Sequence, residues 1–266
     1  MSKLELRQVI KVFGRAPNEA VQLLLQGQSK AQVQKSTGLN VGLAGVDAHF
    51  AAGQISCVMG LSGSGKSTLI RHINRLIDPT YGDILLDGEN ILDYSLRRLR
   101  SFRREKISMV FQSFALLPHL NVIQNVALGL KVRHQAKAQR LEQAQHWLSQ
   151  VDLAGYEHHY PDALSGGMRQ RVGLARALAM DTEILLMDEA FSALDPLIRT
   201  DLQDQLIELQ QRLNKTIIFV THDIKEAMKL GQHLVILKDG KVAQAGTPTQ
   251  IQTHPANEYV ARFIAS

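Results

Sequence analysis

The stretch GLSGSGKST, which begins at Gly60, places the strongest constraint on how this chain folds. It follows the apolar run QISCVM and precedes the amphipathic segment STLIRHINRLI. The spacing of Gly60, Gly65, Lys66 and Ser67 matches the pattern G-x-x-x-x-G-K-[ST]. Glycines let backbone N–H groups turn inward toward phosphate oxygens, and the start of the next helix adds a positive dipole. The sequence therefore predicts a strand, a phosphate-binding loop and a helix, in that order.

The residue types of this loop predict a nucleoside triphosphate site with a magnesium ion. Lys66 can reach the β- and γ-phosphates as a point charge, and Ser67 can offer its hydroxyl to Mg²⁺. The apolar residues of the following segment are spaced for one buried side of a helix that reaches Ile77. The predicted nucleotide-binding residues of the loop are Gly60, Leu61, Ser62, Gly63, Ser64, Gly65, Lys66, Ser67 and Thr68. The apolar positions of the helix are Leu69, Ile70, Ile73, Leu76 and Ile77.

The pattern of apolar residues along the chain predicts an α/β fold. Four short apolar runs end in polar residues, as strands buried on both faces of a parallel sheet do: QISCVMG, KISMVFQ, EILLMDE and TIIFVTH. Helix-length segments lie between them. Asp-Gly pairs at Asp87 and Asp239 stand between apolar runs and predict hairpins. An antiparallel region is therefore expected beside the parallel core.

Two further segments are expected to be helical. Residues 15–40 have the composition of two short helices, the first started by Pro17 and the second by a capping box of Ser29 and Gln32. Residues 113–164 contain helix-forming sequence and, from Asn121 on, no strand signal. We interpret the first segment as an insertion that packs on the fold and the second as an inserted helical subdomain.

Acidic and polar residues at the ends of other predicted strands complement the phosphate loop. Asp188 and Glu189 end the strand EILLMDE, where Asp188 could hold Mg²⁺ and Glu189 could orient or deprotonate an attacking water. His222 and Gln112 end two other predicted strands. Open parallel sheets bind ligands at this edge, so both residues are interpreted as contacts near the γ-phosphate.

A second glycine-containing turn stands before a second predicted helix, in LSGGMRQRVGLARAL. Ser165, Gly166 and Gly167 form a turn that also suits an anion. The chain thus carries two phosphate-binding helix starts for one apparent nucleotide.

This ordered set of motifs resembles the ATP-binding subunits of ABC transporters. The resemblance rests on the loop from Gly60 to Ser67, on Gln112, LSGGM, ILLMDE, SALD and His222, and covers nearly the whole chain. It implies the P-loop ABC cassette fold over residues 1–266 as one ATP-binding domain that hydrolyses ATP. It also implies two copies facing head to tail, with the LSGGM segment of one copy covering the ATP of the other. By resemblance, Gln112 joins Ser67 and Asp188 as a metal ligand, and Asp195 joins the nucleotide-binding residues.

Within this family the chain looks most like the importers of quaternary amines such as glycine betaine, proline betaine and choline. The segments that carry this resemblance are GLSGSGKST, NRLIDPTYGDI, VFQSFALLPH, LSGGMRQRVGLARAL and MDEAFSALDPLIR, together with the insertion after KVFG. Phe13 matches the position at which the family stacks an aromatic ring on adenine. Relatives continue into a regulatory domain, whereas this chain stops at Ser266, so no such domain is expected. The implied partners are a second copy, integral membrane permease subunits and, indirectly, an extracytoplasmic solute-binding protein.

Composition leaves other functions open. The net charge of +5 could favour nucleotides, nucleic acids or an anionic membrane. No apolar run approaches the ~18 residues that span a bilayer, and the N-terminus lacks the apolar core of a secretory signal. The chain is therefore expected in the cytoplasm, and the resemblance implies a peripheral place on the cytoplasmic face of the inner membrane. The basic segment SLRRLRSFRREK is interpreted as a solvated helix face, with no nucleic acid as partner. The alternatives are transport of another solute, export, or a soluble ABC ATPase without a transport role.

Overall fold

The structure, a computed structural model, describes residues 2–265 as two compact units. Unit 1 takes the chain up to Leu96 and from Ile218 onward, and unit 2 takes residues 97–217. Strand β8 (Thr216–Val220) therefore begins in unit 2 and ends in unit 1. None of the helices within residues 2–265 combines the length and the apolar character needed to cross a bilayer.

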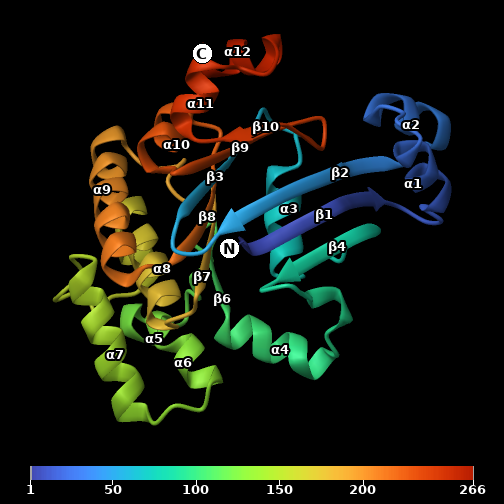
Figure 1. Cartoon of the computed structure of the whole chain (residues 1–266). Coiled ribbons are helices and arrows are strands. Elements are labelled where there is room, and N and C mark those ends of the chain that lie inside the picture. The colour runs from blue at the N-terminus through green and yellow to red at the C-terminus, as the bar shows by residue number, and fades with distance from the viewer. Residues whose placement is uncertain (1, 266) are drawn as a thin grey trace. The chain divides into compact units, whose positions relative to one another are not determined.

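Unit 1 contains an antiparallel sheet in the order β2-β1-β4-β5, and Figure 1 shows β2, β1 and β4 of this sheet side by side. Its strands are β1 (Ser2–Phe13), β2 (Asn40–Ala51), β4 (Tyr81–Leu86) and β5 (Glu89–Asn90). The pairing of Leu86 with Glu89 confirms the hairpin predicted at Asp87-Gly88. The 3₁₀ turn η1 (Ile91–Asp93) follows β5.

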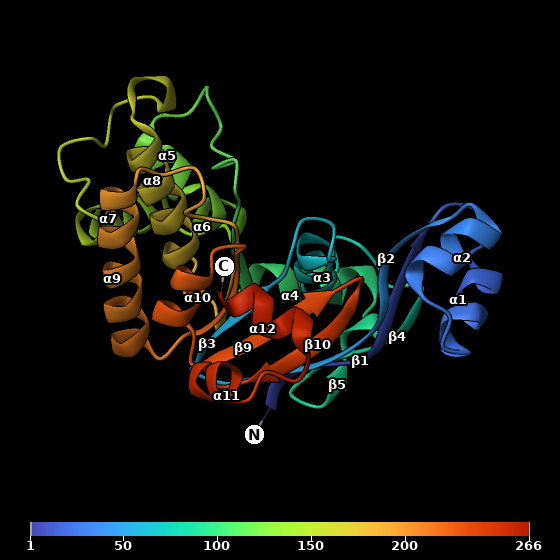
Figure 2. The same ribbon diagram turned by 90° about the horizontal axis from the view of Figure 1, so that it is seen from above.

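Parallel strands form the second sheet region of unit 1. Strand β3 (Ile55–Met59) pairs in parallel with β9 (His233–Lys238), which pairs in antiparallel with β10 (Lys241–Gly246). This confirms the strand predicted in QISCVMG and the hairpin at Asp239-Gly240. The helices α3 (Lys66–Ile73), α10 (Ile224–Leu230), α11 (Pro248–Thr253) and α12 (Glu258–Ala265) complete the unit, with α11 and α12 beside β9 and β10 (Figure 2).

Two helices stand between β1 and β2, at the end of these strands (Figures 1 and 2). They are α1 (Asn18–Leu25) and α2 (Lys30–Thr37). Pro17 stands at the N-cap of α1, and the capping box of Ser29 and Gln32 is confirmed at the start of α2. One buried apolar cluster joins both helices to the strands: Ile10, Val12, Ala20, Val21, Leu24, Val33, Val41 and Ala44. These helices are therefore packed on the sheet.

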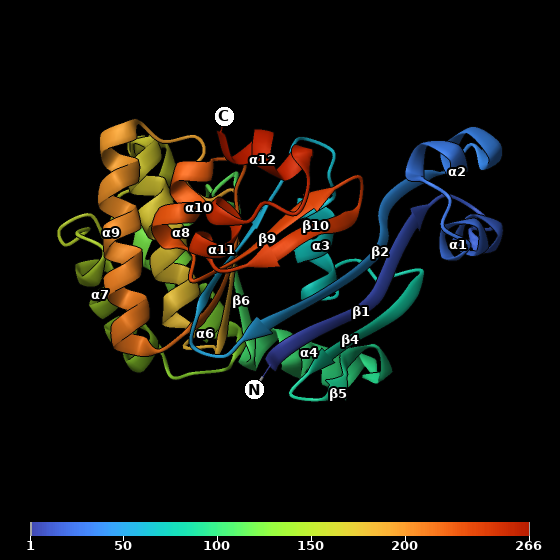
Figure 3. The same ribbon diagram turned by 45° about the horizontal axis from the view of Figure 1, so that its top comes forward.

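Unit 2 contains two parallel strands and a set of helices. Strands β6 (Ile107–Val110) and β7 (Ile184–Asp188) pair in parallel, which confirms the strands predicted in KISMVFQ and EILLMDE. Helix α8 contacts α5, α7 and α9, and it runs beside α9 in Figure 3. The helical elements are α4 (Leu96–Glu105), α5 (Val122–Val126), α6 (Leu128–Val132), α7 (Lys137–Gln150), η2 (Pro161–Ala163), α8 (Gly166–Ala179) and α9 (Pro196–Leu213).

The helix after the phosphate loop is shorter than predicted. Helix α3 ends at Ile73, and Leu76 is 53% exposed, so the expectation of a buried helical side up to Ile77 was wrong. The side chain of Asn74 accepts a hydrogen bond from the N–H of Leu76. Arg75 between them has a φ of 52°, which a helix cannot contain. This local turn ends the helix although the apolar spacing continues.

Two glycines, one in β4 and one in the β4–β5 turn, allow the cost of left-handed backbone to be measured apart from the cost of a steric collision. Gly82 and Gly88 both have left-handed φ values, +93° and +84°. A Cβ at Gly82 would lie 2.4 Å from the carbonyl oxygen of Gln8, whereas a Cβ at Gly88 would meet no atom within 4 Å. The two positions therefore share the left-handed backbone and differ in the steric collision that a side chain would cause.

We expect Gly88→Ala to lower the free energy of unfolding by about 1–2 kcal/mol, the cost of left-handed backbone. Gly82→Ala should lower it by at least ~1 kcal/mol more, because the collision with Gln8 is added. Urea unfolding of both variants and the wild type measures the difference. Equal losses would show that the close approach of the strands carries no cost.

Candidate functional site

The phosphate loop runs from the end of β3 to the start of α3 in unit 1. Gly60, Gly63 and Gly65 have φ values of 149°, 77° and 106°, which residues with a side chain rarely adopt. Gly65 is the N-cap of α3, so the helix begins at Lys66. The conformation of the loop thus depends on its glycines, and its end coincides with a helix N-terminus, as a phosphate cradle requires.

Lys66 is buried inside this loop, with 6% of its surface exposed. Its Nζ donates hydrogen bonds to the carbonyl oxygens of Gly60, at 2.8 Å, and Leu61, at 3.3 Å. A buried ammonium requires such acceptors, because it would otherwise lose its solvation without compensation. The loop therefore encloses the lysine, and two of its carbonyl oxygens satisfy the ammonium.

The β9–β10 turn is hydrogen-bonded to the phosphate loop. The N–H of Gly240 donates to the carbonyl of Ser64 at 3.0 Å, and the N–H of Ala44 donates to the carbonyl of Gly240 at 2.7 Å. The hydroxyl of Tyr259 on α12 donates to Leu237, whose carbonyl oxygen would lie 2.4 Å from a Cβ at Gly60. The Asp-Gly hairpin was predicted from the sequence, but its contact with the loop was not. Local sequence patterns do not predict contacts between residues that lie far apart in the chain.

Phe13 lies beside the phosphate loop despite the two inserted helices. A Cβ at Gly42 would lie 2.8 Å from Cε2 of Phe13 and 3.2 Å from Cγ2 of Thr68. Gly42 therefore stands between the aromatic ring and the second residue after Lys66. The ring is 38% exposed, and Nζ of Lys11 lies 5.3 Å from its centroid. Its exposed surface can accept a flat ring, as the resemblance implies for adenine.

His222 follows the end of β8 in unit 1. The N–H of Thr221, the residue before it, donates to the carbonyl of Val58 at 3.1 Å. Because Val58 is the penultimate residue of β3, His222 follows at the edge from which the phosphate loop leaves. Asp223 caps α10 by accepting a hydrogen bond from Glu226, and His222 itself is exposed.

In unit 2 the two predicted carboxylates end β7. Asp188 is buried, with 5% of its surface exposed, and Glu189 is half-buried. Glu189 has a φ of 47°, an uncommon value for this residue type and one that is often found at functional sites. Nε2 of Gln112, just after β6, lies 3.4 Å from Oε2 of Glu189. The structure therefore brings Gln112 and Glu189 together.

The LSGGM segment opens α8 in unit 2. The hydroxyl of Ser165 accepts a hydrogen bond from the N–H of Met168 at 3.3 Å, so Ser165 is the N-cap. A Cβ at Gly166 would meet no atom within 4 Å, whereas a Cβ at Gly167 would lie 2.7 Å from Cγ2 of Ile198 on α9. Gly167 thus permits close packing, while Gly166 leaves open backbone. Asp195, at the N-cap of α9, is exposed and its side chain does not cap the helix.

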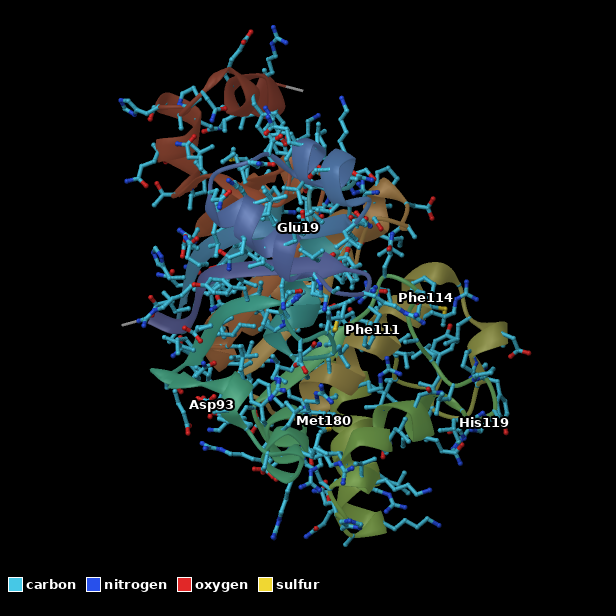
Figure 4. The ribbon with its side chains drawn as sticks, turned by 90° about the vertical axis from the view of Figure 1, so that its right-hand side faces the viewer. Glu19, Asp93, Phe111, Phe114, His119 and Met180 are labelled. Carbon is cyan, nitrogen blue, oxygen red and sulfur yellow. The ribbon has the colours of Figure 1, made fainter. Side chains whose placement is uncertain are left out.

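Arginines of α8 hold the segment that follows Gln112, a feature that sequence reasoning missed. Phe114 and Ala115 have φ values of 61° and 48°, and Arg176 donates to both carbonyls, at 3.0 and 2.7 Å. The guanidinium of Arg169 lies 5.3 Å from the centroid of the Phe114 ring. Figure 4 labels Phe114 where it lies near α8. The segment LARAL contains this arginine, but the neighbouring sequence does not predict which residues it contacts.

The donors available for a metal ion suit magnesium. No group of three or more His, Cys, Asp or Glu residues that could hold a metal occurs in the described part of the chain. The predicted metal ligands are a serine hydroxyl, a glutamine amide oxygen and one buried carboxylate, from Ser67, Gln112 and Asp188. All are oxygen donors, and Mg²⁺ binds through one or two carboxylates together with waters and substrate phosphates. The donor types of these residues, taken one by one, fit the ion.

Comparison with known proteins gives a consistent result. The sequence profile of the ABC transporter family matches residues 43–192. The glycine betaine transport ATP-binding protein OpuAA of Bacillus subtilis is 52% identical over 98% of this chain and 63% of its own length. The trimethylamine N-oxide transport system ATP-binding protein TmoW of Ruegeria pomeroyi is 46% identical over 97% of this chain and 75% of its own length. The chain thus spans less than two thirds of the length of OpuAA and three quarters of that of TmoW.

Solved structures agree with these sequence matches. A dimeric structure of the bacterial ABC transporter cassette MJ0796 superposes with a TM-score of 0.78 and 31% identity, over 92% of this chain and 98% of that one. A second MJ0796 structure, bound to ADP and Pi, matches equally well. The mixed α/β fold, with its parallel core and antiparallel sheet, is the fold of this cassette. The chain belongs to the ABC transporter family, as one of its ATP-binding cassettes.

Proposed function

We propose that this chain hydrolyses ATP to ADP and phosphate and thereby drives the import of a quaternary ammonium osmoprotectant. The observation that carries the proposal is Lys66, buried within a glycine loop that ends at a helix N-terminus. In unit 2, a strained glutamate follows a buried aspartate at a strand end. These are the two parts that phosphoryl transfer to water needs, namely a phosphate cradle and a group that orients water.

In this proposal the phosphate loop binds the triphosphate through Lys66 and the backbone N–H groups from Gly60 to Thr68. The ring of Phe13 stacks on adenine. Ser67 in unit 1, with Gln112 and Asp188 in unit 2, would hold Mg²⁺. The ion supplies neutralisation of the charge that develops on the phosphate oxygens.

Hydrolysis requires a water molecule that attacks the γ-phosphorus. Glu189 accepts a proton of this water while the new P–O bond forms, and the bond between the γ-phosphorus and the bridging oxygen breaks to release ADP. Gln112 lies against Glu189 and restrains its carboxylate. His222 contacts the γ-phosphate and stabilises the charge on its oxygens.

Two copies are proposed to face each other head to tail. Ser165, Gly166 and Gly167, with Asp195, would then cover the ATP held by the loop of the other copy. The open space beside Gly166 supports this, because a helix N-terminus favours an anion and no atom of this chain fills that space. The dimer reported for MJ0796 also supports it.

The proposed transport role rests on the relatives. Their names assign glycine betaine, proline betaine, carnitine or trimethylamine N-oxide to those proteins. For this chain the proposed solute is glycine betaine, proline betaine or choline, carried by separate membrane permease subunits and delivered by an extracytoplasmic binding protein. The cassette would lie on the cytoplasmic face of the inner membrane.

Deletion of the gene should abolish the uptake of glycine betaine, proline betaine or choline under salt stress. Uptake of the three labelled solutes measures this, and normal uptake of all three, with no redundant system present, contradicts the assigned solute.

Lys66→Ala should weaken MgATP binding or turnover at least ~10-fold, because a charged contact to the phosphates is lost. Titration calorimetry and phosphate release measure the two effects. Lys35→Ala, which removes an exposed lysine of α2, is the matched control and should change neither. Unchanged ATPase activity in Lys66→Ala contradicts the proposed function.

Ser165→Arg should block hydrolysis while one copy still binds MgATP, because the new side chain obstructs the γ-phosphate held by the facing copy. Ser165→Ala removes only the helix cap, at a cost of about 1 kcal/mol in stability, and should retain more activity. Binding and phosphate release are measured for both variants. If Ser165→Arg lowers binding and hydrolysis in proportion, the site lies within one chain.

Glu189→Gln should bind MgATP but not hydrolyse it, because the amide cannot accept the proton of the water. Bound ATP then stabilises the paired form, so the variant should be a dimer with MgATP and a monomer without it. Size-exclusion chromatography with light scattering measures this. A variant that binds ATP tightly and stays monomeric even with the permease present rules out the facing pair.

A further inference from the structure

The helical insertion makes a polar contact with the tip of the phosphate loop. Nζ of Lys30, the first residue of α2, donates a hydrogen bond to the carbonyl oxygen of Gly63 at 3.2 Å. The two residues are 33 positions apart, and both belong to unit 1. Within residues 2–265 this carbonyl is the hydrogen-bond partner that the structure gives the ammonium. An ammonium has three N–H donors, so two remain for another acceptor.

The position of Lys30 is unfavourable for the helix that carries it. The N-terminus of a helix is its positive end, so cations in the first turn destabilise it. No acidic residue stands in the first turn of α2 to compensate. Ser29 and Gln32 already cap the backbone through a complete capping box, without any contribution from the lysine. Breaks of a local rule of this kind are expected at functional sites, where another interaction repays the cost.

The insertion holds Lys30 in a fixed place. Val33, one turn after Lys30, is fully buried, and it packs in the cluster that joins α1 and α2 to β1 and β2. On α1, Ala20 and Leu24 belong to the same cluster, while the neighbouring Glu19 is exposed and marks α1 in Figure 4. A side chain that leaves a packed helix loses less conformational entropy when it binds a ligand than one on a free loop. Lys30 is therefore prepositioned beside the loop.

The insertion also begins directly after the aromatic residue of the proposed nucleotide site. Phe13 ends β1 and adjoins Gly42, which Thr68 of the loop also adjoins. The chain then passes through α1 and returns to the tip of the loop with Lys30. Phe13, just before the insertion, thus lies near the end of the loop where α3 begins. Lys30, at the start of α2, lies at Gly63.

We propose that Lys30 is a further nucleotide-binding residue, which contacts the phosphate chain of the nucleotide held by the loop. This inference rests on the proposed function, because it assumes that the loop binds ATP. Gly63 has a left-handed φ, and a Cβ there would meet no atom within 4 Å, so the loop tip is open beside the ammonium. The inserted helices therefore complete the nucleotide site as well as pack on the sheet.

The test compares Lys30→Gln, Lys30→Arg and the control Lys35→Gln, which removes an exposed charge from the same helix. The dissociation constant for MgATP is measured by calorimetry at about 50 and 300 mM salt, where screening differs. Lys30→Gln should weaken binding about 3- to 10-fold at low salt and less at high salt, as expected for a partly exposed charge contact. Lys30→Arg should keep most of the affinity, and Lys35→Gln should change it less than ~1.5-fold.

A purely structural role would give another result. Glutamine can still donate to the carbonyl of Gly63, so a role limited to holding the loop predicts a loss that does not depend on salt. Such a loss, an unchanged affinity, or an equal effect of Lys35→Gln overturns the inference. If the wild type itself binds no MgATP, the proposed function fails first. If the wild type binds MgATP and Lys66→Ala weakens binding while Lys30→Gln does not, this inference alone fails.

Discussion

The site depends on the close approach of two backbone segments, strand β2 and the β9–β10 turn, to the phosphate loop. A Cβ at Gly65 would lie 2.8 Å from the carbonyl oxygen of Gly42, and a Cβ at Gly240 would lie 3.0 Å from the N–H nitrogen of Ala44. Strand β2, the β9–β10 turn and the loop can meet only because these positions lack side chains. The hydrogen bonds of Gly240 with Ser64 and Ala44 then fix the loop.

This constraint explains how a flexible residue type produces a defined site. Glycines cost conformational entropy when the chain folds, and the loop contains three of them with left-handed backbone. The cost is offset because the loop is enclosed between a buried strand and a helix whose apolar residues Leu69, Ile70 and Ile73 are fully buried. Lys66 can then lie inside with its ammonium bonded to loop carbonyls. The rigid surroundings therefore hold a charge where a phosphate chain is expected.

Much of the fold could be predicted because its signals are local. The strand runs, the two Asp-Gly hairpins and the capping box of Ser29 each occupy a few neighbouring residues, and each occurs in the structure. The end of α3 could not be predicted, because the apolar spacing continues through Leu76 while a turn at Asn74 and Arg75 stops the helix. The contacts of Lys30 with Gly63 and of Arg176 with Ala115 join distant parts of the chain. Sequence periodicity carries no information on such pairs.

We propose that two copies of this chain together complete each ATP-hydrolysing site. It is tested most directly by the rate of phosphate release per chain, measured at saturating MgATP over a wide range of protein concentration. A site shared between copies predicts that this specific activity rises with protein concentration and levels off once dimers predominate, because association follows mass action. A specific activity that is independent of concentration, from a protein that remains monomeric throughout, would contradict a site shared between two copies.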